Sequence, residues 1–518
     1  MTINHTRRRL VAGIGASTLA GLWGCGSSAG QSSARGAILE AAAQAEATAK
    51  ALMQRTGIPG LAMAVVHGGE TVYARGFGVR AVGSNEPVDA DTVFQLASMS
   101  KPLGATVVAH EVGNRGVAWD SRMLELMPGF ALHDAAVSAQ LTVGDLYAHR
   151  SGLPDHAGDT LEELGFGQQA IFQRLRQLSL TPFRASYNYT NYGMTAAGVA
   201  VASAAGTDWF TLSDRVLYEP LGMRSTSSRF ADFRARPNRA LGHVKEGGRF
   251  VVGPERPAGT GEQRWSAAYD TDAQSPSGGA SSSVRDLARW MSLLLARGMH
   301  EGRQLVDAAA LDAAMRPQQR MTDASDYGFG FFINAGAAGR MVYSHGGAFA
   351  WGASTYFTIM PALDVGIVVL TNAWPTGVVE SVASTFNDIL DFGAPQRDWF
   401  ALYSAALDQA FLPQGSLVGQ PPPVAPQPPR AAEAYLGNWT NDYHGVARVE
   451  QAAAGLQMRL GPNGQTVYAL RHWSGDTFRF VPLNDSATPG SVSRADFTPG
   501  GLVLEHYNHN GLGVFSRG

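Results

Sequence analysis

A serine and a lysine stand three residues apart, as Ser98 and Lys101, in the mostly small and apolar segment 94–102. On a helix these two side chains would share one face. A serine hydroxyl is a poor nucleophile until a base takes its proton, and a lysine kept uncharged can be that base, whereas arginine cannot. Lysine occurs elsewhere only at Lys50 and Lys245, among 40 Lys+Arg, and neither has a serine three residues before it. The spacing therefore occurs once and predicts acyl transfer through Ser98.

Two later segments carry the other groups that acyl transfer needs. The mechanism requires an acid to protonate the leaving group and N–H donors for the oxyanion. Tyr189-Thr190-Asn191 lies in a tyrosine-rich stretch, and His345-Gly346-Gly347-Ala348 follows a segment with strand character. Together with Ser98 and Lys101, they make three ordered candidate elements.

These elements resemble the motifs of the penicillin-recognising serine hydrolases, a group that includes class C β-lactamases, DD-peptidases, D-aminopeptidases and related carboxylesterases. The resemblance covers roughly residues 58–372. It extends to His149-Arg150-Ser151-Gly152-Leu153, which resembles a family loop, and to Ser277-Gly278-Gly279, which resembles the Gly-Gly segment before a helix.

The resemblance implies a role for each matched residue. Ser98 would be the nucleophile, Lys101 its assisting base, and Tyr189 the second base and the acid for the leaving group. Asn191 would bind a substrate amide. The backbone N–H groups of Ser98 and Ala348 would form the oxyanion hole.

The third element departs from the β-lactamase pattern. His345, followed by Gly346 and Gly347, replaces the lysine that leads this triplet in most β-lactamases, while His345, Gly347 and Ala348 keep a predicted substrate-binding role. A histidine near neutral pH is charged only part of the time, so it suits a substrate carboxylate less well than lysine does. In the second element Tyr187 could be aligned in place of Tyr189. We favour Tyr189 because an asparagine follows it two residues later.

Other polar groupings carry less weight. His149, Asp155, His156 and Asp159 lack a recognised metal-ligand spacing, so we expect structural or loop roles, no metal and no cofactor. A G-x-S-x-G pattern at residues 26–30 lacks the strand and helix that such a nucleophile motif requires.

The distribution of apolar residues predicts an α+β fold. Strand patterns occur at 61–66 and 71–78 and again between residues 327 and 370, with helical patterns between them, including one over 92–114. We therefore expect a β-lactamase-like domain, in which helices flank an antiparallel sheet and a helical subdomain is inserted. A small antiparallel β domain would follow it.

The chain divides into four predicted parts. Residues 1–33 read as an export signal with a short tether, because arginines precede a short apolar run, and Leu22 to Cys25 resembles a lipobox with Cys25 as the lipidated residue. The hydrolase domain would span 34–411, a Pro-rich linker 412–429 and the β domain 430–518.

We expect an exported protein, periplasmic or lipid-anchored in a bacterial envelope through Cys25. A net charge of −3 argues against a nucleic-acid partner. The predicted activity is amide cleavage in small peptides through an acyl-enzyme on Ser98. A carboxylesterase or weak β-lactamase with the same site is the alternative, and a penicillin-binding sensor or envelope scaffold without turnover is an alternative of another class. The sequence leaves the oligomeric state open.

Overall fold

The computed structural model describes residues 28–253, 270–482 and 484–518. Cys25 and most of the predicted export segment lie outside these ranges. Helix α1 (Ser28–Thr56) begins at Ser28, so the end of the segment 1–33, predicted as a short tether, is helical. No proline interrupts residues 28–56, so the helix of the alanine-rich sequence extends back through the predicted tether to Ser28.

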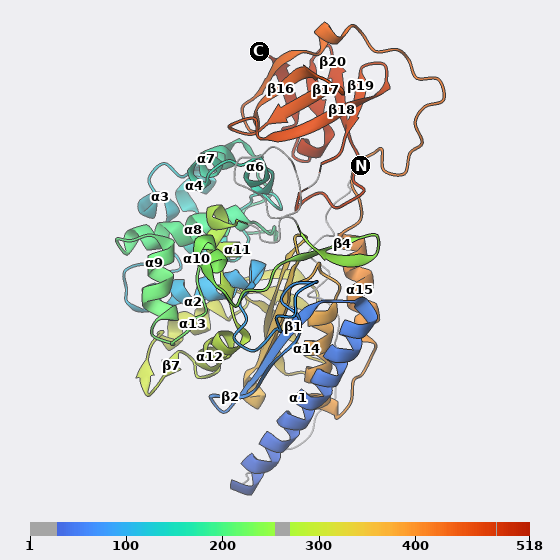
Figure 1. Ribbon diagram of the computed structural model, residues 1–518. Coiled ribbons are helices and arrows are strands. Elements are labelled where there is room, and N and C mark those ends of the chain that lie inside the picture. Colours follow the sequence, from blue (N-terminus) through green and yellow to red (C-terminus); the bar gives the residue numbers. More distant parts are fainter. Residues whose placement is uncertain (1–27, 254–269, 483) are drawn as a thin grey trace.

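An eight-stranded antiparallel sheet forms the centre of the larger domain, with the order β2-β1-β14-β13-β12-β11-β10-β9 (Figure 1). β1 (Gly60–His67) pairs on one side with β2 (Glu70–Gly78) and on the other with β14 (Val365–Thr371). Strands from both ends of the domain thus lie side by side, as predicted. The remaining strands are β9 (Gln319–Thr322), β10 (Ser325–Tyr327), β11 (Phe332–Ala335), β12 (Met341–Phe349) and β13 (Ala353–Met360).

Helices cover both faces of the sheet. Leu61 and Val65 of β1 pack on the side of α1 and α14 (Val378–Phe392), whereas Ala62 and Ala64 pack on the side of α12 (Val284–Leu295). Successive residues of a strand point to opposite faces, so a strand covered on both faces becomes a continuous apolar run. This explains why β1, β13 and β14 are buried along almost their whole length.

The segment between β2 and β9 forms the inserted helical subdomain, which confirms the predicted fold class. Its first long helix, α2 (Ser100–Gly113), packs against α8, α11 and α13. The other helices here are α3 (Met123–Leu126), α4 (Ala135–Gln140), α5 (Val143–Tyr147), α6 (Asp159–Glu163), α7 (Gln168–Arg174), α8 (Asn191–Ala204), α9 (Trp209–Ser213), α10 (Phe230–Ala235), α11 (Ser275–Gly278), α12 (Val284–Leu295) and α13 (Ala308–Ala314). Short strand pairs join β3 (Phe94–Gln95) to β6 (Ser281–Ser282), β4 (His243–Glu246) to β5 (Arg249–Val252) and β7 (Met299–His300) to β8 (Arg303–Gln304).

Two local predictions were wrong. The helix predicted from residue 92 begins only at Ser100, because β3 pairs with β6 and the turn Ala97–Met99 intervenes. The apolar run 327–333 is not one strand, because it turns between β10 and β11. Gly330 has a φ of 87°, which an L side chain rarely adopts.

A closed eight-stranded barrel forms the C-terminal domain, which confirms the predicted antiparallel β domain. It follows α15 (Trp399–Ala410) and residues 412–429, which contain no helix or strand. Pairing of the first and last strands closes the barrel and removes the free sheet edges. Its strands are β15 (Gly437–Asn441), β16 (Gly445–Ala452), β17 (Gly455–Leu460), β18 (Thr466–Ser474), β19 (Thr477–Phe480), β20 (Ser493–Thr498), β21 (Gly501–Leu504) and β22 (Val514–Arg517).

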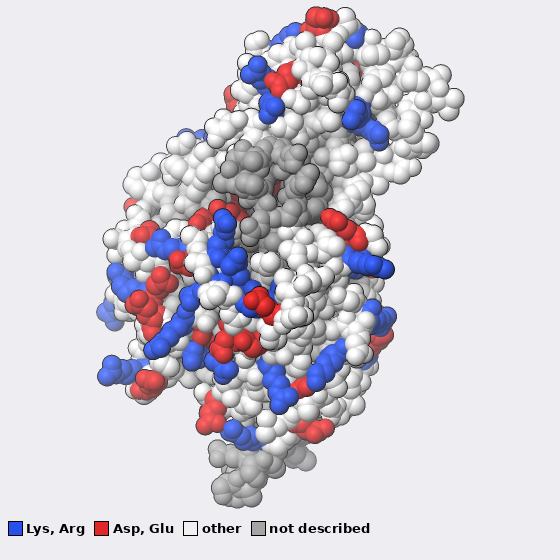
Figure 2. Space-filling view, in the orientation of Figure 1, with Lys and Arg blue, Asp and Glu red and all other residues white. Residues whose placement is uncertain are grey.

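The surface carries charges of both signs. Figure 2 shows Lys and Arg interspersed with Asp and Glu over the larger domain. Within the described ranges, none of the helices combines the length and hydropathy needed to cross a membrane.

Candidate active site

Ser98 lies in the 3₁₀ turn Ala97–Met99, which connects β3 directly to α2. The preceding Ala97 has a φ of 49°, a left-handed conformation that is costly for a residue with a Cβ. Ser98 is 7% exposed, and it precedes the N-terminus of α2, where the helix dipole is positive. The turn therefore presents a buried hydroxyl in a sparsely populated backbone conformation, a combination typical of functional sites.

Lys101 lies one turn further on and is fully buried. Its Nζ is 3.3 Å from Ser98 Oγ, 2.7 Å from Asn191 Oδ1 and 2.9 Å from the carbonyl oxygen of Ser277. It also lies 4.5 Å from the ring centre of Tyr189. These contacts hold the amine within reach of the serine proton, as a general base requires.

Tyr189 provides a second group on Ser98. Its hydroxyl is 2.6 Å from Ser98 Oγ, and its backbone N–H donates to Asp155 at 2.6 Å. Tyr187, the alternative alignment, instead packs with Tyr327 at a ring-centre distance of 5.3 Å. The structure therefore places Tyr189, and not Tyr187, at the nucleophile.

Asn191, at the start of α8, links the lysine to an acidic residue. Its side-chain oxygen accepts from Lys101, and its Nδ2 donates to the two carboxylate oxygens of Asp159 at 3.3 and 3.1 Å. Asp159 also contacts Nδ1 of His156 at 2.9 Å. Asp159 thus lines the cavity at Ser98, with His156 as its neighbour. In the described part of the chain, no group of three or more His, Cys, Asp or Glu side chains could hold a metal ion.

His345 lies within β12 and is 1% exposed. Its Nδ1 is 2.6 Å from the carbonyl oxygen of Gly346, and its Nε2 is 3.0 Å from the hydroxyl of Tyr327. Phe332 stacks on the ring at 4.5 Å. A carbonyl oxygen can only accept, so Nδ1 carries a proton, and a neutral ring satisfies both contacts when Tyr327 donates.

Gly347 allows β12 to approach the nucleophile turn. A Cβ built on Gly347 would lie 2.1 Å from the carbonyl oxygen of Leu96 and 2.9 Å from the N of Met99. Both are backbone atoms that flank Ser98. Only glycine fits this distance, and the next residue, Ala348, follows on the same strand beside that turn.

Replacing Gly347 with alanine should therefore damage catalysis more than its single methyl group suggests. The clash must displace either β12 or the turn that carries Ser98, and a displacement of about 1 Å can cost about 10²-fold in rate. We expect kcat/KM to fall by about 10²-fold or more, measured on purified protein with an activated ester. Gly346→Ala is the matched control, because its Cβ would meet first a side-chain atom, Cδ2 of Tyr356, at 3.3 Å. Equal losses in the two variants would contradict this account.

The cavity at Ser98 has a volume of about 20 Å³ and is walled by carboxyl groups. Three come from α6 and one from the barrel segment between β19 and β20, and none of the lining residues is Lys or Arg. The lining residues are Ser98, Asp159, Glu162, Glu163, Asn191, Gln274, Gly278, Phe349, Asp485 and Ser486.

Hydrogen bonds hold the barrel segment over this cavity. The backbone N–H of Ser486 donates to Glu163 at 2.8 Å, and the backbone N–H of Ala350 donates to Asp485 at 2.7 Å. Burial raises the pKa of Glu163 to about 8 and that of Glu162 well above its ordinary value. The barrel therefore contributes directly to the cleft.

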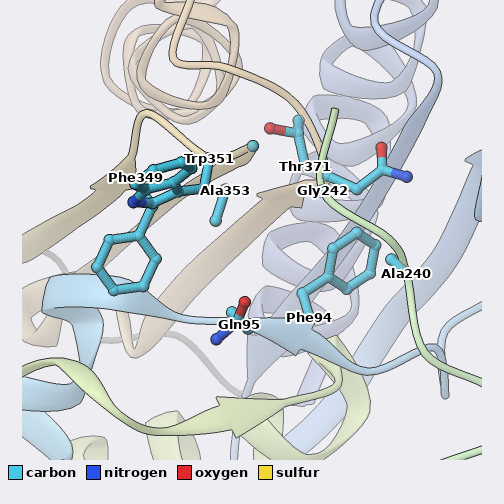
Figure 3. Close-up of a pocket in the computed structure, with 10 residues that line it drawn as sticks. Phe94, Gln95, Ala240, Gly242, Phe349, Trp351, Ala353 and Thr371 are labelled. Atoms are coloured by element: carbon cyan, nitrogen blue, oxygen red, sulfur yellow. The ribbon is translucent and has the colours of Figure 1, made fainter. Parts of the chain in front are cut away.

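Phe349 also lines another, smaller cavity of about 10 Å³, shown in Figure 3. In that view Phe349 and Trp351 form one side, and Phe94 and Gln95 lie opposite them. The aromatic rings make this neighbouring space largely apolar.

The β-lactamase family model matches residues 45–389, about two thirds of the chain. The chain belongs to the β-lactamase family. Members of this family are serine hydrolases, so this protein has the fold of a serine hydrolase with a C-terminal barrel. A second model, a domain of unknown function (DUF3471), matches residues 421–498.

Several named proteins are similar to this β-lactamase-family chain. The unguisins hydrolase ungD of Aspergillus violaceofuscus is 26% identical over 85% of this chain and 84% of its own length. Penicillin-binding protein 4 of Amycolatopsis lactamdurans is 28% identical over 62% of this chain and 83% of its own. Esterase EstB of Burkholderia gladioli is 27% identical over 62% and 88%.

Solved structures show the same fold. The octameric penicillin-binding protein homologue from Pyrococcus abyssi matches with a TM-score of 0.58 and 17% identity, over 90% of this chain and 98% of its own. A class C β-lactamase from Rhodobacter sphaeroides matches with a TM-score of 0.53 and 20% identity, over 66% and 97%.

Several residues of this β-lactamase-family site had no role assigned from the sequence, among them Tyr327, Ser277, Glu163 and Asp485. Tyr327 and the carbonyl of Ser277 contact His345 and Lys101, but each lies far along the chain from its partner. Glu163 and Asp485 carried no motif. Only the Ser277-Gly278-Gly279 segment, which resembles a family segment, gave a signal in the sequence.

Proposed function

We propose that this protein is an exported serine hydrolase that cleaves amide bonds of small peptides through an acyl-enzyme on Ser98. Contacts of Lys101 and Tyr189 with Ser98 Oγ support their roles. In the forward step Lys101 and Tyr189 relay the serine proton while Oγ attacks the carbonyl carbon. Backbone N–H groups of Ser98 and Ala348 stabilise the oxyanion.

Collapse of the tetrahedral intermediate breaks the amide bond, and Tyr189 passes a proton to the departing amine. Water then attacks the ester on Ser98, with Tyr189 acting as base. The carboxylic acid product leaves, and Ser98 regains its proton.

The acidic wall of the cavity is the observation that favours peptides with a free amino group. Asp159, Glu162, Glu163 and Asp485 lie together beside Ser98, and an ammonium group there would gain from ionised carboxyls. A substrate carboxylate would be repelled by those of the four that are ionised, and Glu162 and Glu163 ionise only at raised pH. His345 adds no fixed positive charge, so the wall and the triplet both disfavour carboxylate-bearing β-lactams.

The test is a substrate panel on purified full-length protein. We expect short peptides with a free N-terminus to be cleaved with kcat/KM about tenfold or more above their N-acetylated forms, because acetylation removes the cationic charge. The preference should rise as the pH increases toward about 8, because Glu163 then loses its proton more readily. Above that pH the substrate amine itself loses its charge, so the preference should fall again.

Glu163→Gln separates this account from a general loss of activity. The variant should lower the ratio of kcat/KM between free and N-acetylated peptides while retaining turnover of a neutral p-nitrophenyl ester. Arg320→Gln, an exposed change elsewhere, is the control. Equal cleavage of free and acetylated peptides by the natural protein would refute the amine preference, and rapid turnover of esters alone would support the carboxylesterase hypothesis.

The β-lactamase and sensor hypotheses each have their own readout. Cleavage of a chromogenic cephalosporin would support the weak β-lactamase, and a penicillin adduct that never discharges would support the sensor or scaffold. Export and lipidation are tested by mass spectrometry of the mature N-terminus, which should begin at lipidated Cys25. An unprocessed N-terminus in the native host would refute this part of the proposal.

A further inference from the structure

A second cavity lies on the face of the central sheet opposite Ser98, between β11–β13 and helices α14 and α15. Its volume is about 100 Å³, several times the space that one water needs. Ser344 and Thr358 are directly paired on β12 and β13 and both line it. The next pair, His345 and Phe357, lies on the other face, because side chains alternate along a strand.

The two helices give this cavity a polar wall and an aromatic wall. α14 contributes Ser384 and Asn387, and Asn387 accepts a hydrogen bond from Thr358 at 3.2 Å. α15 contributes Trp399 and Tyr403, whose rings stack with centres 5.8 Å apart. The cavity therefore has polar groups from α14 and aromatic rings from α15.

The carboxylates that line the cavity already have partners. Asp388 accepts from the indole N–H of Trp399 at 2.7 Å, and Asp391 is paired with Arg340. The Arg397 guanidinium lies 4.9 Å from the centre of the Trp399 ring. The cavity therefore has hydrogen-bonding groups without a large excess of either charge, which favours a neutral ligand over an ion.

Glu380, one turn before Ser384 on α14, has an unsatisfied buried oxygen near this cavity but does not line it. It is 5% exposed, and its Oε2 is buried without a hydrogen-bond partner. It precedes Ser384 by four residues on α14, so the two share the helix face toward the cavity. Its charge acts on Tyr356 and Tyr403, which both line the cavity.

We propose that this cavity binds a neutral, hydroxyl-rich ring of monosaccharide size. The ring would lie against the aromatic wall of Trp399 and Tyr403, and its hydroxyls would bond to Asn387 and Ser384. This combination of an aromatic face with amide, hydroxyl and carboxyl groups matches a saccharide, which presents C–H groups on one face and hydroxyls at its edge. The site is separate from Ser98 and does not depend on the proposed peptidase activity.

Calorimetric titration of the full-length protein with glucose and with N-acetylglucosamine tests the proposal. We expect saturable binding in the millimolar range and about tenfold or greater weakening in Asn387→Leu. Gln409→Leu makes the same amide-to-leucine change at an exposed position of α15 outside the cavity, and it should bind as the natural protein does. Tyr403→Phe removes one hydroxyl and serves as a second variant if Asn387→Leu has a lowered Tm without ligand.

Three outcomes would overturn the proposal. They are no binding of either sugar at tens of millimolar, binding that Asn387→Leu and Gln409→Leu retain equally, and preferential binding of acetate or tetramethylammonium. Ser98→Ala should bind the sugars as the natural protein does, which keeps this result distinct from any failure of the proposed hydrolase activity.

Discussion

Ser98→Ala should abolish acylation, with kcat/KM falling by about 10⁴-fold or more for every substrate that the protein turns over. The reason is that Ser98 Oγ is the atom on which Lys101 and Tyr189 converge, at 3.3 and 2.6 Å. A fluorophosphonate probe, followed by peptide mapping, measures this directly. The natural protein should carry the label on Ser98 alone.

Ser100→Ala provides the matched control for this experiment. Ser100 lies two residues later and is also buried, but its hydroxyl donates to the carbonyl oxygen of Ala97 at 2.7 Å and so has a structural partner. Its variant should still be labelled on Ser98, although its turn is weakened. Label that persists in Ser98→Ala would show that another residue is the nucleophile.

Lys101→Arg should cost about 10²- to 10⁴-fold in kcat/KM, the range that a general base contributes. Arginine keeps a positive charge and hydrogen-bond donors, but it does not release a proton at any working pH. The guanidinium is also larger than the ammonium in a site with no exposed surface. The rate of labelling by the fluorophosphonate should fall in parallel with kcat/KM.

Lys50→Arg makes the same substitution at a half-exposed position, where the lysine pairs with Glu46, and it should leave the rate unchanged. Lys101→Met, which removes the charge without the added bulk, distinguishes loss of the base from a packing defect. Its Tm should stay near that of the natural protein while its activity is lost. Full activity in either Lys101 variant would show that Tyr189 alone activates the serine.

The barrel gives the cleft a property that the catalytic residues do not determine. Asp485 and Ser486 lie in a segment between two barrel strands, yet they complete the wall that α6 begins. Ser98, Lys101 and Tyr189 could have the same arrangement whether or not the barrel segment covered the cleft. Substrate preference should therefore respond to changes in this segment more than the acylation chemistry does.

The sequence alone predicted the Ser98 and Lys101 pair and the order of the three elements, and it determined the α+β class. Ser98 and Lys101 were identifiable because their interaction is local, one turn apart, and lysine is scarce in this chain. The main strands were identifiable as apolar runs. The pairing of β3 and the break after Tyr327 were not identifiable, because each depends on partners elsewhere in the chain.

Only the tertiary structure decided which tyrosine reaches the serine and what surrounds it. Tyr187 and Tyr189 are two positions apart in the same motif, so the sequence does not distinguish their roles. In the structure Tyr187 packs against Tyr327, whereas the hydroxyl of Tyr189 contacts Ser98 Oγ. Glu163 and Asp485 come from different domains of the chain, yet they meet over Ser98. Neither carries a local pattern, because an acidic wall arises from where folded elements converge, and that convergence is set by the packing of the whole chain.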